Sequence, residues 1–223
     1  MGYKITIDGP SGAGKGSVAK GLSEKLDILN IDTGAMYRTL ALYCIQNNVN
    51  VDNVNDVINV LSDVDIYLKN EDGVVSAYLN DLNVSSKIRT EQVGFVAAKV
   101  SSILPVREYM RQKQRAMTGT QNVVAEGRDI GSVVFPDADL KIFLTADVET
   151  RAQRRYKDML EKNKEITYES VLEYIIQRDE LDRTRKISPL VKTEDMIEID
   201  NTNMSKEEVV EKVLELIKEK GLV

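Results

Sequence analysis

The sequence predicts an α/β fold in which a five-stranded parallel sheet is flanked by helices. The first observation is a set of short β-branched runs, each ending at a turn or cap residue as buried strands do. These runs are Lys4–Asp8, Ile28–Asp32, Val123–Glu126, Leu140–Thr145 and Met196–Asp200. The second observation is the helical spacing of Val18, Leu22 and Leu26 between the first two runs. A strand, a helix and a strand within about 30 residues form the unit from which parallel sheets are built.

Helical periodicity predicts the helices that follow along the chain. They cover Ala35–Asn47, Val106–Met117, Glu149–Lys162 and Tyr168–Asp182. Thr167 directly precedes the last of these and is expected to cap it. A final helix begins at Ser205, because Glu208 three residues later completes a capping box.

The connection between the second and third strands is too long for a simple crossover. It spans about 90 residues, several times the usual length. Residues 64–69 (VDIYLK) and 73–80 (GVVSAYLN) predict a β-hairpin with a short turn. Helical stretches are expected on either side of it, at 53–62 and 85–103. We therefore expect residues from about 60 to 105 to form a small inserted lobe on a single α/β domain.

The composition narrows the possible chemistry. The 223 residues carry 30 Lys+Arg and 36 Asp+Glu, a net charge of −6, and 42% of them are apolar. There is no histidine and only one cysteine, which excludes Ser-His-Asp and Cys-His pairs, imidazole metal sites and an internal disulfide. The acidic balance and the lack of tryptophan argue against nucleic acid as the main partner. No apolar run reaches about 18 residues and the N-terminus enters a strand at once, so we expect a cytoplasmic protein without a membrane span.

The first strand runs into a glycine-rich loop, Gly9-Pro10-Ser11-Gly12-Ala13-Gly14-Lys15-Gly16-Ser17. Its spacing fits G-x-x-x-x-G-K, a phosphate-binding loop, in the required position between a strand and a helix. Glycines let successive backbone N–H groups turn inward around an anion, and the following helix adds its positive N-terminal dipole. We expect Lys15 to bridge the β- and γ-phosphates of a nucleotide. The alternative, a glycine-rich turn that contains a lysine by chance, is disfavoured by the flanking strand and helix.

The residue after the loop lysine departs from the common pattern. Many phosphate-binding loops place there a Ser or Thr hydroxyl that binds Mg²⁺, whereas this chain has Gly16 and then Ser17. We therefore expect Mg²⁺ to be held mainly by phosphates and water near Ser17, without a direct protein ligand. The Gly-Lys-Gly sequence resembles nucleoside-monophosphate kinases rather than GTPases. Consistently, Asn163-Lys164 lacks the aspartate of a guanine-reading motif.

Three further charged segments are expected where a second substrate binds, since ligands of open α/β sheets lie beyond the carboxyl ends of the strands. They are residues 32–38 (DTGAMYR), 126–131 (EGRDIG) and 178–185 (RDELDRTR). Taken singly, each has a plain alternative: a helix cap, a surface ion pair and a solvated helix face. Three such segments beside a phosphate-binding loop indicate one anion site.

These motifs, in this order, resemble the bacterial cytidylate kinase family. The similar segments are IDGPSGAGKGS, IDTGAMYR, EGRDIGSVVFPDADLKIFLTA, RAQRRY, RDELDRTR and SPL, which span nearly the whole chain. The resemblance implies a P-loop NTPase-type sheet with an inserted, β-containing monophosphate-binding lobe and a short helical lid. It divides the single domain 1–223 into a core (1–35, 106–150 and 166–223), a monophosphate-binding region with its insert (about 36–105) and a lid (about 151–165).

The resemblance also implies a reaction, phosphoryl transfer from ATP to CMP or dCMP with Mg²⁺. Such transfer needs in-line positioning and charge neutralisation, which suits an arginine-rich site without histidine. The implied catalytic residues are Lys15, Arg128, Arg155 and Arg185. ATP is expected to contact the loop from Gly9 to Ser17 and three lid arginines, Arg151, Arg154 and Arg155. Arg151 and Arg155 share a helix face and are expected to reach the phosphates together.

For the acceptor, the resemblance implies one group of residues for each part of CMP. Arg38, Arg128 and Arg185 are assigned to the phosphate, Arg178 and Asp182 to the ribose, and Asp129 and Arg107 to the base, with Asp32, Thr33, Tyr37 and Ser101 completing the set. A carboxylate that accepts a hydrogen bond from the cytosine amino group predicts CMP over UMP. Many family members have a serine where this chain has Ala98, so that contact is either absent or supplied by Ser101 or water. Asp32 orients the loop or the acceptor site, or simply ends a strand.

Two alternatives remain open at this point. One is another small-molecule kinase of the same architecture, acting on UMP, AMP, dTMP or shikimate. The other is a binding module that holds a nucleotide without turnover. For the cytidylate kinase function that the resemblance implies, we expect a monomer whose partners are the small-molecule nucleotides ATP, CMP and dCMP, and neither nucleic acid nor a membrane.

Overall fold

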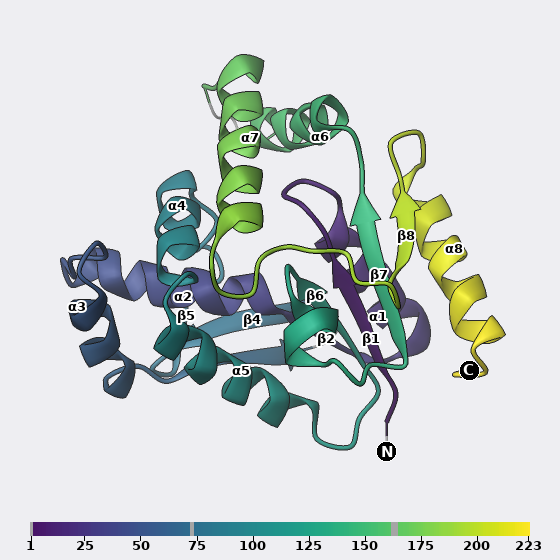
Figure 1. Cartoon of the computed structure of the whole chain (residues 1–223), viewed down its shortest axis with the longest axis horizontal. Coiled ribbons are helices and arrows are strands. Elements are labelled where there is room, and N and C mark those ends of the chain that lie inside the picture. The colour runs from purple at the N-terminus through teal and green to yellow at the C-terminus, as the bar shows by residue number, and fades with distance from the viewer. Residues whose placement is uncertain (1, 72–73, 162–164) are drawn as a thin grey trace.

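A central sheet of five parallel strands organises the computed structural model, which describes residues 2–71, 74–161 and 165–223 (Figure 1). The strand order is β2-β6-β1-β7-β8. The strands are β1 (Lys4–Asp8), β2 (Leu29–Asp32), β6 (Val123–Gly127), β7 (Leu140–Thr145) and β8 (Ile197–Asp200). All five predicted strands are confirmed, with ends that differ by at most one residue. Because neighbouring strands are parallel, their carboxyl ends meet at one edge, and the predicted motifs follow β1, β2 and β6 there.

Helices and a short turn cover the two faces of this sheet. On one face α1 (Lys15–Leu26) and α8 (Lys206–Glu219) pack against the strands in one buried cluster that includes Ile5, Leu22 and Val210. The predicted capping box at the start of α8 is confirmed. On the other face lie α5 (Leu104–Thr118) and an unpredicted π-helical turn, Ile130–Val134. No helix in the described part of the chain is both long and apolar enough to cross a membrane.

The long connection builds a second, antiparallel sheet. The strand order of this sheet is β3-β4-β5. The sheet shares one buried core with α2 (Thr33–Gln46) and α3 (Val54–Asn59). A 3-10 turn, Val60–Ser62, follows α3. Its strands are β3 (Ile66–Glu71), β4 (Val74–Leu79) and β5 (Leu82–Asn83). The predicted hairpin is confirmed, but residues 70 and 71, expected in its turn, extend β3 instead, because they pair with Val75 and Val74. The rest of the expected turn, at 72–73, lies outside the described residues. The sequence did not predict β5, because two residues are too short to show a pattern.

The helix predicted over 85–103 is wrong at both ends, since α4 spans Glu91–Val100. Ser85 is tied to the small sheet instead, because its Oγ accepts a hydrogen bond from the Ala77 N–H at 2.9 Å. Thr90 then caps the helix by accepting from the Val93 N–H at 3.2 Å. The chain therefore becomes helical only after residue 90.

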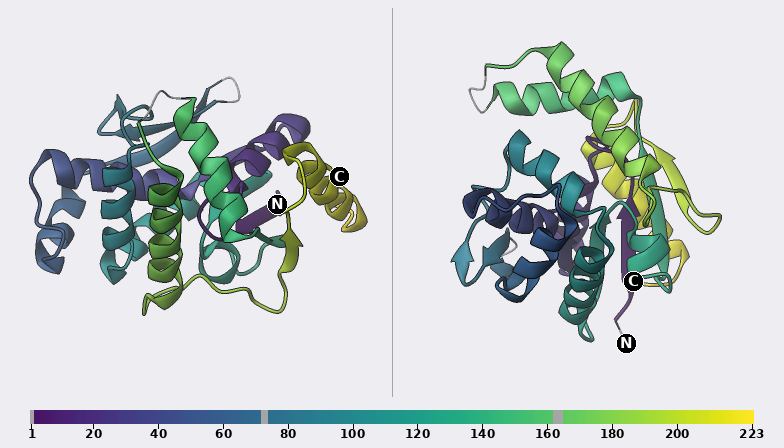
Figure 2. Two further views of the ribbon diagram at one scale, coloured as in Figure 1. Left: turned by 90° about the horizontal axis from the view of Figure 1, so that it is seen from above. Right: turned by 60° about the vertical axis from the view of Figure 1, so that its left-hand side comes forward.

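Two further helices, α6 (Val148–Leu160) and α7 (Tyr168–Thr184), lie beyond the carboxyl ends of the strands (Figures 1 and 2). They pack on each other through Ala152, Met159, Val171 and Ile175. The helix predicted over 149–162 is confirmed as far as Leu160, and Lys162 lies outside the described residues. Thr167 caps α7 as predicted, by accepting from the Ser170 N–H.

Candidate functional site

The loop between β1 and α1 has the predicted strand-to-helix position and borders an open cavity. Gly12 and Gly14 have φ angles of +76° and +89°, in the left-handed region that favours glycine. The Lys15 ammonium donates to the Pro10 carbonyl at 2.8 Å, and the Ala13 carbonyl accepts from the Asn201 side chain at 2.9 Å. The adjoining cavity has a volume of about 710 Å³, and its lining includes Ser11, Gly12, Gly14, Lys15, Gly16 and Ser17.

Lys15 is buried, with 5% of its surface exposed. Burial, reinforced by the nearby Arg128 charge, lowers the pKa of Lys15 to about 7, although Glu126, Asp182 and Asp8 act in the opposite direction. The protein thus holds an ammonium group where the charged form is disfavoured unless an anion joins it. A phosphate group supplies such an anion.

A second cavity, of about 190 Å³, opens beside the loop and is rich in arginine. Charged side chains reach it from α2, α5, α6, α7, the ends of β2 and β6, and the segment just before α4. The arginines that line it are Arg38, Arg89, Arg107, Arg128, Arg155, Arg178 and Arg185. The structure therefore brings together every arginine that the sequence assigned to the acceptor. Asp129, Thr33, Tyr37, Ser101 and Asp32 line the same cavity.

Three aspartates in or directly behind this cavity each pair with two or three of its arginines. Asp32 accepts from Arg38 at 3.1 Å and from Arg89 at 2.8 Å, and it also caps α2 by accepting from the Ala35 N–H. Burial alone raises the pKa of Asp32, but the two arginines outweigh it and lower the pKa to about 2. Asp32 therefore holds Arg38 and Arg89 together in addition to capping the helix.

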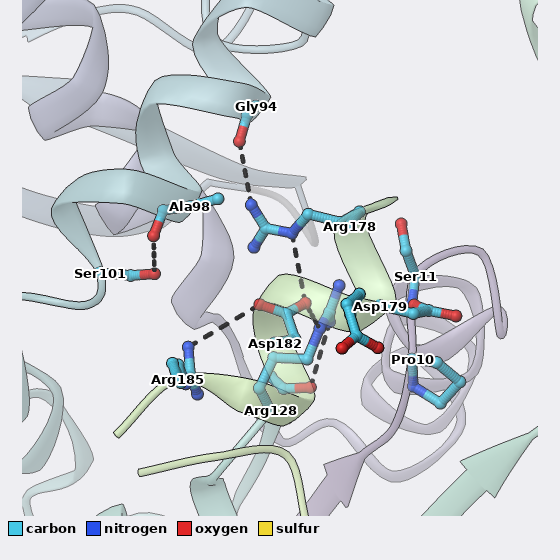
Figure 3. Close-up of polar contacts among 12 residues, drawn as sticks. Pro10, Ser11, Gly94, Ala98, Ser101, Arg128, Arg178, Asp179, Asp182 and Arg185 are labelled. Carbon is cyan, nitrogen blue, oxygen red and sulfur yellow. Dashed lines mark hydrogen bonds and ion pairs between the residues drawn. The ribbon is translucent and has the colours of Figure 1, made fainter. Parts of the chain in front are cut away.

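The second aspartate, Asp182, lies on α7 and accepts from Arg128 at 2.7 Å and from Arg178 at 3.2 Å (Figure 3). Arg178 in turn donates to the Gly94 carbonyl of α4 at 3.0 Å. Burial opposes the charged form of Asp182, yet Arg128 and Arg178 lower its pKa to about 2. These contacts fix the distance between α7, α4 and the end of β6.

The third aspartate, Asp129, pairs with Arg107 and lies 3.5 Å from Arg185. Arg107 also donates to the Ser101 carbonyl at 2.9 Å, and its guanidinium carbon lies 5.6 Å from the centre of the Tyr37 ring. The Ser101 hydroxyl donates to the Ala98 carbonyl at 2.8 Å (Figure 3), so it is already engaged within α4. In this corner Asp129 supplies charged hydrogen-bond acceptors, and Arg107 and Arg185 supply donors.

The three arginines of α6, predicted to belong to a lid, have different places. Arg155 lies over the Tyr174 ring at 4.7 Å and borders both cavities described above. Arg154 donates to the Asn201 side chain at 2.9 Å and lines a third cavity of about 410 Å³ between α6 and α8. Arg151 is buried and donates to the Ser11 carbonyl at 2.8 Å and to Asp179. The expected joint approach of Arg151 and Arg155 to a phosphate is therefore not supported, because the Arg151 guanidinium is engaged by the protein.

A family model for cytidylate kinase matches residues 5–219. The chain belongs to the cytidylate kinase family. It is similar to the cytidylate kinase of Carboxydothermus hydrogenoformans, with 46% identity over 98% of both chains. It is equally similar to the cytidylate kinase of Thermosipho melanesiensis, with 46% identity over 99% of both. An uncharacterized protein from Eubacterium ventriosum shares the fold, with a TM-score of 0.52 over 97% of this chain and 98% of that one at 13% identity.

Within the region that matches the cytidylate kinase family, the sequence assigns no role to two charged residues of the site. Arg89 lies inside a predicted helix, and no motif marks it. Glu126 ends the third predicted strand, within the charged segment 126–131, and its register opposite Asp32 is the signal that it lies in the site. Its carboxylate borders both cavities, and burial, followed by the charge of Asp32, raises its pKa. Thr33, by contrast, was predicted, and its hydroxyl donates to the Glu126 carbonyl at 2.7 Å.

Proposed function

We propose that this chain transfers the terminal phosphoryl group of ATP to CMP or dCMP, giving ADP and CDP or dCDP. The observation that carries the proposal is that the loop cavity and the arginine cavity are adjacent and share lining residues. Asp32, Arg38, Arg89, Glu126, Arg128 and Arg155 line both of them. Two anion-binding sites that share a wall suit the direct transfer of a phosphoryl group from one bound nucleotide to another.

On the donor side, the proposal places the ATP phosphates in the loop from Gly9 to Ser17. The glycine φ angles and the α1 N-terminus favour an anion there, and Lys15 exchanges its bond to Pro10 for the phosphates. The third cavity, between α6 and α8, is next to Gly12 and Gly14 and is large enough to accept the adenosine part. Arg154 and Met204 lie in its lining.

The residues beside the loop also fit Mg²⁺. A Cβ atom at Gly16 would lie 3.3 Å from Glu126 Oε1, so this carboxylate occupies the side on which other loops place a hydroxyl. Carboxylate oxygens and water suit Mg²⁺, and Ser17 lines the same cavity. We propose that Glu126 and Ser17 hold the hydration shell of Mg²⁺ and that the ATP phosphates supply its direct ligands. When bound, Mg²⁺ neutralises charge on the phosphates.

On the acceptor side, Arg38, Arg128 and Arg185 are proposed to bind the CMP phosphate. Without a ligand these guanidinium groups pair with carboxylates. When the CMP phosphate binds, it replaces these carboxylates as the partner of the arginines, so it does not bind to unpaired positive charges. The attacking atom is a phosphate oxygen of CMP, which is already ionised at neutral pH, so no general base is needed. A bond forms from this oxygen to the γ-phosphorus as the bond between that phosphorus and the bridging oxygen of ADP breaks. Lys15 and Arg155 neutralise the charge on the transferring group.

The remaining acceptor contacts set specificity. Arg178 and Asp182 are proposed to bind the ribose, and Asp129 with Arg107 to bind the base. A carboxylate facing the cytosine amino group favours CMP, because the uracil carbonyl would leave an acceptor facing an acceptor at a cost of about 1–3 kcal/mol. Ala98 offers no hydroxyl, and the Ser101 hydroxyl donates to the Ala98 carbonyl but keeps its lone pairs as acceptors. We propose that Asp129, the charged acceptor, makes the larger contribution to this selectivity.

A coupled assay of ADP release tests the proposal and its alternatives together. ATP and Mg²⁺ are offered with CMP, dCMP, UMP, AMP, dTMP and shikimate in parallel. Fast turnover on CMP and dCMP, with UMP far behind, is the expected result. Faster turnover on another acceptor overturns the proposed substrate, and ATP binding without turnover on any acceptor supports a binding module. The proposal includes a monomeric, cytoplasmic enzyme that does not act on nucleic acid.

A further inference from the structure

The backbone of Ser11, in the middle of the phosphate-binding loop, is held on both sides by one buried ion pair. Its N–H donates to Asp179 Oδ1 at 3.0 Å, and its carbonyl accepts from Arg151 Nη1 at 2.8 Å. Arg151 Nη1 also donates to Asp179 Oδ2 at 2.5 Å. We name these three residues the loop latch. The latch joins segments that are 140 and 168 residues apart from Ser11 in sequence.

The loop latch is rigid on its α6 side. Arg151 Nε donates to the Ala146 carbonyl at 2.9 Å, and only 4% of the Arg151 surface is exposed. A Cβ atom at Gly12 would lie 3.1 Å from Arg151 Cβ, so the loop and α6 are already in close contact. A buried charge of this kind is costly unless its partner stays in place, so loss of Asp179 must displace the loop, Arg151 or both.

The α7 side of the loop latch connects it to the acceptor cavity. Asp179 follows Arg178 directly and lies almost one helical turn before Asp182. Figure 3 shows Asp179 on the side of α7 next to Ser11, while Asp182 points toward Arg128 and Arg178. One helix therefore contacts the donor loop with one carboxylate and the acceptor arginines with another.

We propose that Asp179 and Arg151 are positioning residues for phosphoryl transfer. By fixing Ser11 to α7, they set the distance between the donor loop and the acceptor site that the same helix carries. Neither residue touches a nucleotide, since both are consumed by the protein contacts above. The inference rests on the proposed function for its kinetic consequence, although its effect on ATP binding does not depend on the acceptor.

The decisive variant is Asp179→Asn, which keeps the shape of the side chain and removes its charge. With the loop released, we expect ATP to bind about 10-fold more weakly, measured by calorimetry without an acceptor. We expect kcat to fall about 10- to 100-fold, because a displacement near 1 Å at a reacting centre can cost about 100-fold. The KM for CMP should change less than about 3-fold, since the acceptor arginines keep their own partners.

The matched control is Asp195→Asn, which removes the aspartate that pairs at 2.5 Å with the buried Lys141 at the amino end of β7. It should leave ATP affinity and kcat unchanged. Arg151→Lys provides a second test, since a lysine keeps the charge but cannot bond to Ala146, Ser11 and Asp179 in the same planar arrangement. It should lower kcat and ATP affinity in the same direction, and it keeps the inference testable if Asp179→Asn does not fold.

A folded Asp179→Asn or Arg151→Lys variant with kcat and ATP affinity within about 2-fold of the unmodified protein overturns the inference. A variant with lower thermal stability but unchanged kcat and ATP affinity also overturns the inference, because an ion pair with a purely structural role would have this effect. If the unmodified protein gives no CMP-dependent ADP release, the proposed function fails. The ATP-affinity measurement still decides in that case whether the loop latch shapes the loop.

Discussion

The loop cavity and the arginine cavity both suit phosphate groups, but they are built from different kinds of chemical groups. The loop uses one continuous segment, with backbone N–H groups, glycines at positive φ and a single buried ammonium group. The arginine cavity collects guanidinium groups from helices and loops far apart in the sequence, and aspartates pair with several of them.

The difference lies in how each site meets the cost of holding positive charge without its ligand. In the loop, Lys15 shows the cost directly, because burial lowers its pKa to about 7. In the arginine cavity, Asp32 and Asp182 compensate the charge, and their pKa values fall to about 2. The donor site is therefore poised to gain charge when ATP binds, whereas the acceptor site is already charged and has to exchange partners.

The largest expected effect comes from removing the single cation of the loop. Lys15→Ala should reduce turnover at least about 100-fold, roughly 3 kcal/mol, because no second ammonium group of the loop replaces the lost charge. Steady-state ADP release with saturating CMP measures it. Lys25→Ala, which removes an exposed lysine of the same helix that pairs with Glu211, is the control. Near-normal turnover of Lys15→Ala would show that other cations can replace Lys15 at the phosphates, as several arginines can in the arginine cavity.

A smaller effect, on selectivity, is expected in the arginine cavity. Asp129→Asn should narrow the ratio of kcat/KM for CMP over UMP by about 10-fold, because an amide can turn to donate to the uracil carbonyl. Asp65→Asn, which removes the partner of the exposed Lys113, should leave the ratio unchanged. An unchanged ratio in Asp129→Asn would move base reading to another residue, with Arg107 next in line.

The same contrast explains what the sequence predicts and what it does not. The loop from Gly9 to Ser17 is local, so its motif, its strand and its helix are all predictable from one stretch of sequence. The arginines that follow strand ends were predictable because parallel strands end at one edge. The pairing of Asp179 with Ser11 was not, because it depends on how α7 packs against a loop 168 residues away.

The arginines of α6 show that helical spacing alone does not predict which side chains reach a site. Arg151 and Arg155 are one turn apart, as predicted, but the packing of α6 on the loop turns the first into a structural contact and leaves the second between the cavities. The helix predicted over 85–103 failed for a related reason. The hydrogen bond from the Ala77 N–H of the small sheet to the Ser85 side chain competes with helix formation. A tertiary hydrogen bond of this kind leaves no periodic pattern in the sequence.

The smallest expected effect is a proton taken up when ATP binds. Because the pKa of Lys15 is lowered to about 7, part of the unliganded molecules hold this lysine neutral at pH 7, and more do so at pH 8. ATP phosphates favour the ammonium form, so binding should take up protons, and more of them at pH 8 than at pH 7. Calorimetry in two buffers of different ionisation enthalpy measures this uptake. Lys15→Arg, whose guanidinium stays charged, is the reference that subtracts the protons of ATP itself.

The lowered pKa of Lys15 also predicts how the stability of the unliganded protein depends on pH. Because folding lowers the pKa of Lys15 from 10.5 to about 7, the unfolded chain binds more protons than the folded chain between these values. The free energy of unfolding should therefore rise with pH from about 7 toward 10.5, relative to Lys15→Arg. Denaturant unfolding at pH 7 and pH 9 compares the two proteins. Equal pH dependence and equal proton uptake would mean that Lys15 keeps its charge without a ligand, and the contrast between the two anion sites would then disappear.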